Sequence, residues 1–188
     1  MKTKFSVLLV SLLFNFSIYA QREFKEVAKR IGLENIEEFK SFLALANDAA
    51  LPEDIIHNIS WAKSQLQELG FKVETLETSA LPLLLANQTF KKGKPTIAFY
   101  MHLDGQGVDR TKWNQEDPYV AVLKKMNKND FQEIGWNKLM DGEIDDYRIF
   151  ARSSSDDKGP FVMLLTALKH LSTIGKNPEF NIKMILDA

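Results

Sequence analysis

One apolar run most constrains how this 188-residue chain can fold. Residues Thr96–Met101 follow a Gly-Lys-Pro turn and lead directly into the polar triplet His102-Leu103-Asp104. The run predicts a buried strand whose end carries an imidazole and a carboxylate. Residues i and i+2 of an extended segment point the same way, so both groups would enter one space. In open α/β sheets ligands bind at the carboxyl ends of strands, so the position favours a binding site.

Helical and extended patterns alternate along the rest of the chain. Apolar residues at helical spacing predict four helices, over residues 23–31, 34–46, 52–69 and 159–174. Extended patterns predict four further strands, over residues 71–78, 81–86, 147–151 and 181–186. Pro82 favours an edge position for the second of these strands. The alternation predicts an α/β fold with a largely parallel sheet flanked by helices.

Residues 105–146 are polar and show little periodicity. A connection this long is uncommon in a compact domain unless it has a function, such as lining a site. The simpler interpretation is a surface excursion that holds a short helix near Val120–Met126. Both interpretations stay open at this point.

The first twenty residues have the pattern of a secretory signal peptide. Lys2 and Lys4 precede the mostly apolar segment Phe5–Ile18, and Ala20 offers a small residue for cleavage before Gln21. The apolar segment is too short to favour a stable membrane span. We therefore expect an exported protein, periplasmic or secreted, with no membrane span after cleavage. A buried N-terminal strand is the alternative interpretation.

Composition excludes some classes of site. The chain has no cysteine, so a bound metal would need nitrogen and oxygen ligands. The 24 basic residues nearly balance the 25 acidic ones, so no basic footprint suggests nucleic-acid binding.

A second polar motif precedes the helix predicted from residue 159. It reads Ser-Ser-Ser-Asp-Asp-Lys-Gly and places Asp156 and Asp157 just ahead of the helix. Hydroxyl and acidic residues at this position are typical of an N-cap, and carboxylates there complement the helix dipole. That structural interpretation explains one aspartate without any metal.

The two motifs in this order resemble a known enzyme family. A strand followed by His-x-Asp, then Ser-Ser-Asp-Asp-Lys-Gly opening a helix, then a strand ending in Leu-Asp is similar to metallopeptidase family twenty. These co-catalytic zinc exopeptidases and deacylases include dipeptidases, glutamate carboxypeptidases, aminoacylases, acetylornithine deacetylase and succinyl-diaminopimelate desuccinylase. The resemblance runs from about Glu34 to the last residue.

The resemblance implies roles for three residues. His102 would be a ligand of one zinc ion, and Asp156 would bridge two. Asp104 would be a catalytic residue that hydrogen-bonds His102 and tunes its basicity. The complete enzyme would hold two Zn²⁺ per site, or other divalent metals. The fold would be the N-terminal part of a zinc-exopeptidase-like catalytic domain.

The family pattern continues beyond what this chain contains. In the family, the strand matching residues 181–186 is followed by two glutamates, a general base and a zinc ligand. The chain ends at Ala188, before either of them and before the dimerisation or lid domain. Residues 21–188 are therefore expected to be the N-terminal portion of a catalytic domain, inactive alone.

The chain also departs from the family pattern at two loops. The family usually has Gly-Arg-Gly where this chain has Ala151-Arg152-Ser153, so the usual loop conformation is in question. The His-x-Asp motif is often followed by Val-Pro, but here Gly105 and Gln106 follow. The segment 105–146 would be an insertion similar to that of a dipeptidase-like branch.

The leading hypothesis is a zinc-dependent peptidase or N-acyl amino acid amidohydrolase that acts by metal-activated water. Its partner would be a peptide or N-acyl amino acid substrate, and the full-length form would be a homodimer. One alternative is a non-enzymatic, truncated or decayed copy that folds without catalysis. Another is a complete small α/β binding domain in which His102, Asp104 and Asp156 meet by coincidence. The nucleotide sequence just past Ala188 would separate the first two.

Overall fold

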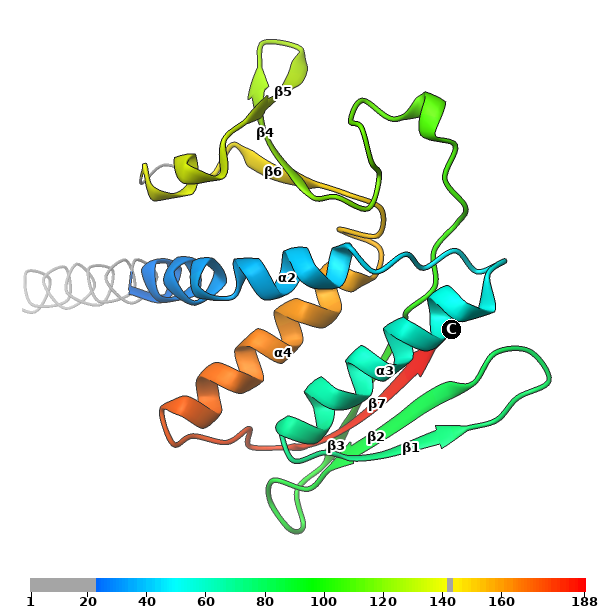
Figure 1. Cartoon of the computed structure of the whole chain (residues 1–188). Helices are drawn as coiled ribbons and strands as arrows, with labels where there is room; N and C mark the ends of the chain where they lie inside the picture. The colour runs from blue at the N-terminus through cyan, green and yellow to red at the C-terminus, as the bar shows by residue number, and fades with distance from the viewer. Residues whose placement is uncertain (1–22, 142–143) are drawn as a thin grey trace, which may run out of the picture. The chain divides into compact units, whose positions relative to one another are not determined.

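The computed structural model describes residues 23–141 and 144–188 (Figure 1). Residues 23–34 are helical and belong to a unit that ends at Ile36, whereas Glu37–Ala188 form a second unit. The predicted signal peptide lies outside the described residues. Within the described ranges, no helix is long and apolar enough to cross a membrane.

The elements of the second unit follow the predicted order closely. Its helices are α2 (Ile36–Leu43), which begins at the last residue of the first unit, α3 (Pro52–Glu68) and α4 (Lys158–Thr173), with short 3-10 turns at Arg110–Lys112 and Trp136–Met140. Its strands are β1 (Lys72–Leu76), β2 (Leu83–Gln88), β3 (Thr96–His102), β4 (Val122–Asn127), β5 (Asp130–Ile134), β6 (Tyr147–Phe150) and β7 (Asn181–Asp187).

Four of the strands form one mixed sheet in the order β1-β2-β7-β3. The α/β fold is therefore confirmed, but the sheet is not largely parallel. Strand β3 pairs with β7 in parallel, whereas β1 with β2 and β2 with β7 are antiparallel. The β1–β2 connection, residues 77–82, is too short for the crossover that parallel neighbours require.

The positions of two strands in the sheet differ from those predicted. Strand β3 lies at the edge of the sheet as described, with Ile97 and Tyr100 exposed, and is not a buried strand. Strand β2 lies inside the sheet, between β1 and β7. Pro82 precedes the first residue of β2 and therefore withholds no hydrogen bond from the ladder.

The main core lies between this sheet and the helices. Alternate residues of β2 and β7 face the same buried cluster as the apolar sides of α3 and α4, so both helices lie on one face of the sheet (Figure 1). The centre of the cluster is aromatic: the rings of Phe42 and Trp61 stack at 3.9 Å, and Phe161 meets Phe42 edge-on at 6.2 Å. This packing holds α4, and with it the turn that precedes α4, against the sheet.

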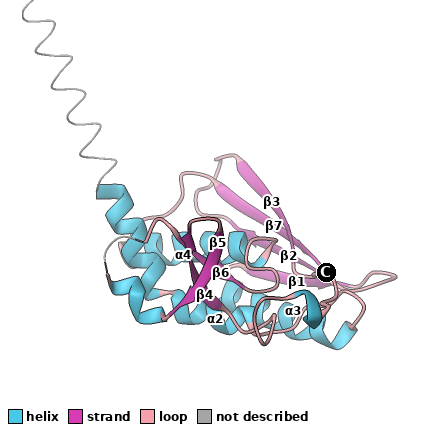
Figure 2. Cartoon of the chain, turned by 90° about the horizontal axis from the view of Figure 1, so that it is seen from above, coloured by secondary structure: helices cyan, strands magenta, loops and turns pink. Residues whose placement is uncertain are grey.

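Part of the segment 105–146 forms β4 and β5, which with β6 make a second, three-stranded sheet in the order β5-β4-β6 (Figure 2). The short helix expected near Val120–Met126 is wrong, because residues 122–127 form β4. Strand β4 has partners on both sides, and Lys128 at φ 55° turns the chain between β4 and β5. Tertiary pairing and the burial of Leu123 outweigh the weak local preference for helix.

Candidate active site

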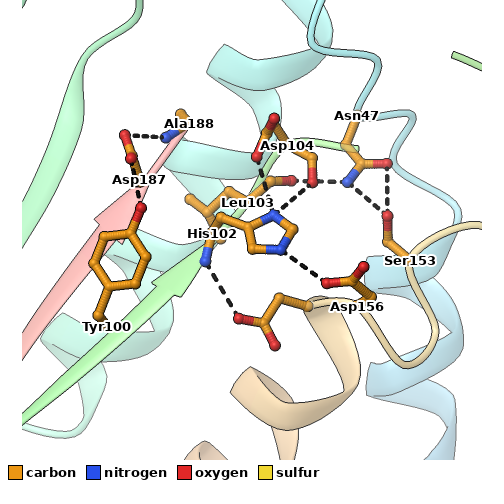
Figure 3. Close-up of polar contacts among 10 residues, drawn as sticks. Asn47, Tyr100, His102, Leu103, Asp104, Ser153, Asp156, Asp187 and Ala188 are labelled. Atoms are coloured by element: carbon orange, nitrogen blue, oxygen red, sulfur yellow. Dashed lines mark hydrogen bonds and ion pairs between the residues drawn. The ribbon is translucent and has the colours of Figure 1, made fainter. Parts of the chain in front are cut away.

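The structure brings His102, Asp104 and Asp156 together, as the sequence predicted (Figure 3). His102 ends β3 and lies in register with Asp187 of β7, at the carboxyl ends of the two parallel strands. Its Nδ1 lies 3.0 Å from Oδ1 of Asp104, and its Nε2 lies 2.9 Å from Oδ1 of Asp156. One imidazole is therefore held between two carboxylates from segments about fifty residues apart.

The two sides of the imidazole differ in their surroundings. The backbone oxygen of Asp104 also lies 3.0 Å from Nδ1 of His102, so two acceptors face this nitrogen. The Asp104 side chain is 35% exposed, whereas that of Asp156 is 84% exposed. The sheltered nitrogen is therefore the one that should carry a proton, and Nε2 faces the open side.

The pKa of His102 reflects the same arrangement. Partial burial lowers this pKa, but hydrogen bonds to Asp156 and Asp104 and the charge of Asp104 outweigh it. The net effect raises the His102 pKa above its ordinary value. In the absence of metal, the two carboxylates stabilise the imidazolium form.

The turn before α4 is shaped differently from a simple N-cap. Asp157 occupies the N-cap position of α4, but its side chain makes no capping hydrogen bond. Its Oδ2 instead accepts a hydrogen bond of 3.4 Å from the backbone N–H of His102. The Asp156–Asp157 peptide bond is cis. Both aspartates thus face the end of β3, and the N-cap interpretation does not describe either side chain.

The loop before α4 has Ser153 where the family usually has its second glycine, yet the backbone there is left-handed. Ser153 has φ of 61°, a region that glycine enters more easily than other residues. Its hydroxyl lies 3.0 Å from Nδ2 of Asn47, which is fully buried. Asn47 carries no signal in the sequence, because it lies in the non-periodic segment between α2 and α3 and belongs to no motif.

Lys158 is another buried polar residue at this end of α4. Its side chain is fully buried, and Nζ donates to the backbone oxygens of Phe42 at 2.9 Å and Leu45 at 2.5 Å. Nζ also lies 4.6 Å from the centre of the Phe42 ring. Burial lowers the pKa of Lys158 to about 7, against a smaller raising effect of Asp54. Lys158 thus joins the start of α4 to the end of α2.

Asp187 does not join the imidazole. Its Oδ2 accepts a 2.7 Å hydrogen bond from the Tyr100 hydroxyl, and its Oδ1 accepts one of 3.0 Å from the Ala188 backbone N–H. The bond to Asp187 raises the pKa of Tyr100. Figure 3 shows this pair beside the imidazole and directed away from it.

The donors present fit part of a zinc site. An imidazole nitrogen and a carboxylate oxygen are suitable zinc ligands, and a carboxylate on the far ring nitrogen is the usual orienting partner. A catalytic zinc has three protein ligands, however. Among residues 23–141 and 144–188, no three His, Cys, Asp or Glu side chains could hold a metal ion together. The described residues therefore offer two ligands of the three required.

Comparison with known proteins finds relatives of this chain. No family model matches the chain. The beta-Ala-His dipeptidase of mouse is 24% identical over 171 residues, which cover 82% of this chain and 30% of the relative. The human beta-Ala-His dipeptidase is also 24% identical with the same coverage.

Solved structures agree with the sequence relatives. The crystal structure of human carnosine dipeptidase 1 has a TM-score of 0.66 at 24% identity, and the match covers 87% of this chain and 34% of that one. An M20 family metallo-carboxypeptidase from Sulfolobus solfataricus has a TM-score of 0.60 at 25% identity, over 82% of this chain and 30% of that one. The chain is homologous to the M20 metallopeptidases. This confirms the resemblance to metallopeptidase family twenty and the fold class that it implied.

The match covers only part of the relatives' length. The chain spans 30% of the length of the beta-Ala-His dipeptidases that it matches. What those proteins do as a whole therefore comes to this chain only as a proposal.

Proposed function

We propose that this M20 homologue supplies the His–Asp part of a zinc-dependent hydrolase centre that cleaves peptide bonds. One observation carries the proposal: the His102 ring has a carboxylate at each nitrogen, one sheltered and one open to solvent. The substrate class is a dipeptide or short peptide, in keeping with the names of the relatives. An N-acyl amino acid is the second substrate class.

Each of the three residues has a distinct part in the proposal. Nε2 of His102 and the carboxylate of Asp156 would hold Zn²⁺ or another divalent ion, and Asp156 would also serve a second ion in a complete site. Asp104 keeps the proton on Nδ1, so that the lone pair of Nε2 points outward. Zinc bound at such a site activates water and polarises the scissile carbonyl.

A folded domain without catalysis is the second candidate function. It is favoured by the donor set, since the described residues provide two metal ligands and not three. The hydrolase proposal requires His102 and Asp156 to bind zinc, whereas a folded domain without catalysis does not.

Zinc binding tests the proposal directly. We expect the chain to bind Zn²⁺ weakly, and His102→Ala or Asp156→Asn to abolish this binding, because each removes one of the two ligands that the described residues provide. Asp104→Asn is expected to weaken it about 10- to 100-fold, the usual cost of losing an outer partner of a ligating histidine. Titration of Zn²⁺ into ¹⁵N-labelled protein measures all three effects, through the ring signals of His102 where the histidine is present and through the backbone amide signals around residue 156 in His102→Ala.

The control for this titration is His57→Ala, which removes an exposed histidine from α3. This variant should bind zinc as the unaltered chain does. Zinc binding that survives His102→Ala would contradict the proposed metal site.

We further propose that residues 1–20 direct export to the periplasm or the outside of the cell. The support is the basic, apolar and small-residue pattern that ends at Ala20. Expression in a Gram-negative host should yield a protein that begins at or near Gln21 in the periplasmic fraction. N-terminal sequencing of an uncleaved cytoplasmic form would overturn the expectation, and deletion of residues 2–20 is the control that should abolish export.

A further inference from the structure

A hydrogen-bonded cluster, which we call the Asn47 clasp, lies next to the segment that carries the imidazole. It consists of Asn47, Leu103, Gly105 and Ser153 (Figure 3 shows all but Gly105). Nδ2 of Asn47 donates to the Leu103 backbone oxygen at 2.8 Å and to the Ser153 hydroxyl at 3.0 Å. The backbone oxygen of Asn47 accepts from the Gly105 N–H at 2.6 Å. One residue therefore joins three distant segments of the chain.

The side chain at position 47 has to be an amide. Its NH₂ group serves two acceptors, and the Ser153 hydroxyl in turn lies 3.3 Å from its Oδ1. An aspartate at position 47 would keep the size but would lose both donors. Leaving such buried acceptors unpaired is costly, so the clasp tolerates little change.

Close packing around Gly105 makes the clasp rigid. A Cβ atom at Gly105 would lie 2.8 Å from the Ser153 hydroxyl and 3.1 Å from the Asn47 amide atoms. The backbone at Gly105 also accepts a 2.9 Å hydrogen bond from the Ala49 N–H. The segment that carries Asp104 therefore packs closely against the side chains of Asn47 and Ser153.

The two segments held by Asn47 are the ones that carry the imidazole and its partners. Leu103 lies between His102 and Asp104, and Ser153 lies three residues before Asp156. Asp156 itself is 84% exposed, so few neighbours restrain its side chain. On the C-terminal side of Asp156 the loop is held by Asp157, which accepts from the His102 N–H, and by the buried Lys158. On its N-terminal side the nearest buried residue is Ser153, which is bonded to Asn47.

We propose that Asn47 is a positioning residue that sets His102 against Asp104 on one side and Asp156 on the other. Its contribution to metal binding rests on the proposed function, whereas its effect on the imidazole does not. Removing the amide should let the Asp104 segment and the Asp156 loop move independently. His102 would then lose the acceptors that fix its ring.

The test compares three variants by NMR without metal and then with zinc. Asn47→Asp removes the two donors at constant size. Ser153→Gly removes only the link to the Asp156 loop, and glycine accepts the φ of 61° without strain. Asn181→Ala is the matched control: Asn181 is also buried and also joins two backbone segments, through Lys91 N–H and Lys94 oxygen, but at the opposite end of β7.

The first readout is the ring nitrogen that carries the proton when His102 is neutral. The unaltered chain should show Nδ1–H, because two Asp104 oxygens face this nitrogen. Asn47→Asp should shift the ring toward Nε2–H, whereas Ser153→Gly and Asn181→Ala should leave it unchanged. A loss of stability alone would not change the tautomer in one variant and spare it in the control.

The second readout is zinc affinity, expected to fall about 10-fold in Asn47→Asp and in Ser153→Gly but not in Asn181→Ala. An Asn47→Asp protein that keeps both the Nδ1–H tautomer and the zinc affinity would overturn the proposal. If Asn47→Asp does not fold, an unchanged zinc affinity in Ser153→Gly overturns it instead. If the unaltered chain binds no zinc, the proposed function fails, and the tautomer of Asn47→Asp still decides the role of Asn47.

Discussion

Lys158→Ala is expected to lower the free energy of unfolding by about 4 kcal/mol, a large share of the roughly 5–15 kcal/mol of a typical domain. The substitution empties the space of a fully buried side chain beside Phe42. It also leaves the Leu45 backbone oxygen without its Lys158 donor, whereas the Phe42 oxygen keeps a 3.2 Å bond from the Leu45 N–H. Lost packing and a lost buried hydrogen bond therefore act together.

Urea denaturation, followed by the fluorescence of Trp61, which stacks on Phe42, measures this change. Lys158→Met keeps most of the volume and removes only the hydrogen bonds, so it should cost about half as much. The exposed Lys92→Ala should stay within about 0.5 kcal/mol of the unaltered chain. A Lys158→Ala protein as stable as Lys92→Ala would show that the α2–α4 link contributes nothing.

The 188-residue chain is expected to hydrolyse neither dipeptides nor N-acyl amino acids when zinc is added. A catalytic zinc needs three protein ligands, and His102 and Asp156 are the two that come together among the described residues. Asp187, the nearest further acid along the sheet, is bonded to Tyr100 and not directed at the imidazole. Of the carboxylates beside the pair, Asp104 is bonded to Nδ1 of His102 and Asp157 to its backbone N–H, so neither is placed as a general base, a group worth about 10²- to 10⁴-fold in rate.

The assay uses the purified chain with a panel of dipeptides and N-acyl amino acids, at several zinc concentrations. Turnover must be compared with that of His102→Ala, since a contaminating peptidase would survive this substitution. Turnover that is present in the chain and absent in His102→Ala would show that the site is complete as it stands.

Local sequence patterns predicted most elements of the fold. The apolar spacing of residues 52–69 and 159–174 gave α3 and α4 to within a residue or so of their ends. Local patterns did not predict the elements whose structure or position depends on pairing with distant strands. Residues 122–127 became a strand because β5 and β6 pair with both of its sides, and the interior place of β2 follows from its pairing with β7. Such pairings join residues far apart in the chain, so no local pattern reports them.

The sequence by itself determined that an imidazole and carboxylates would meet at the end of a strand. His102 and Asp104 are two residues apart in an extended segment, so their side chains enter one space. Asp156 lies just before a predicted helix, and the order of the two motifs, which resembles a known family, predicted that it would join them. Only the tertiary structure decided how they are held. Asn47 and Lys158 act through backbone oxygens of distant segments, at Leu103 for the first and at Phe42 and Leu45 for the second. Every residue carries such an oxygen, so the partner of a buried amide or amine is set by packing in space and leaves no motif in the sequence.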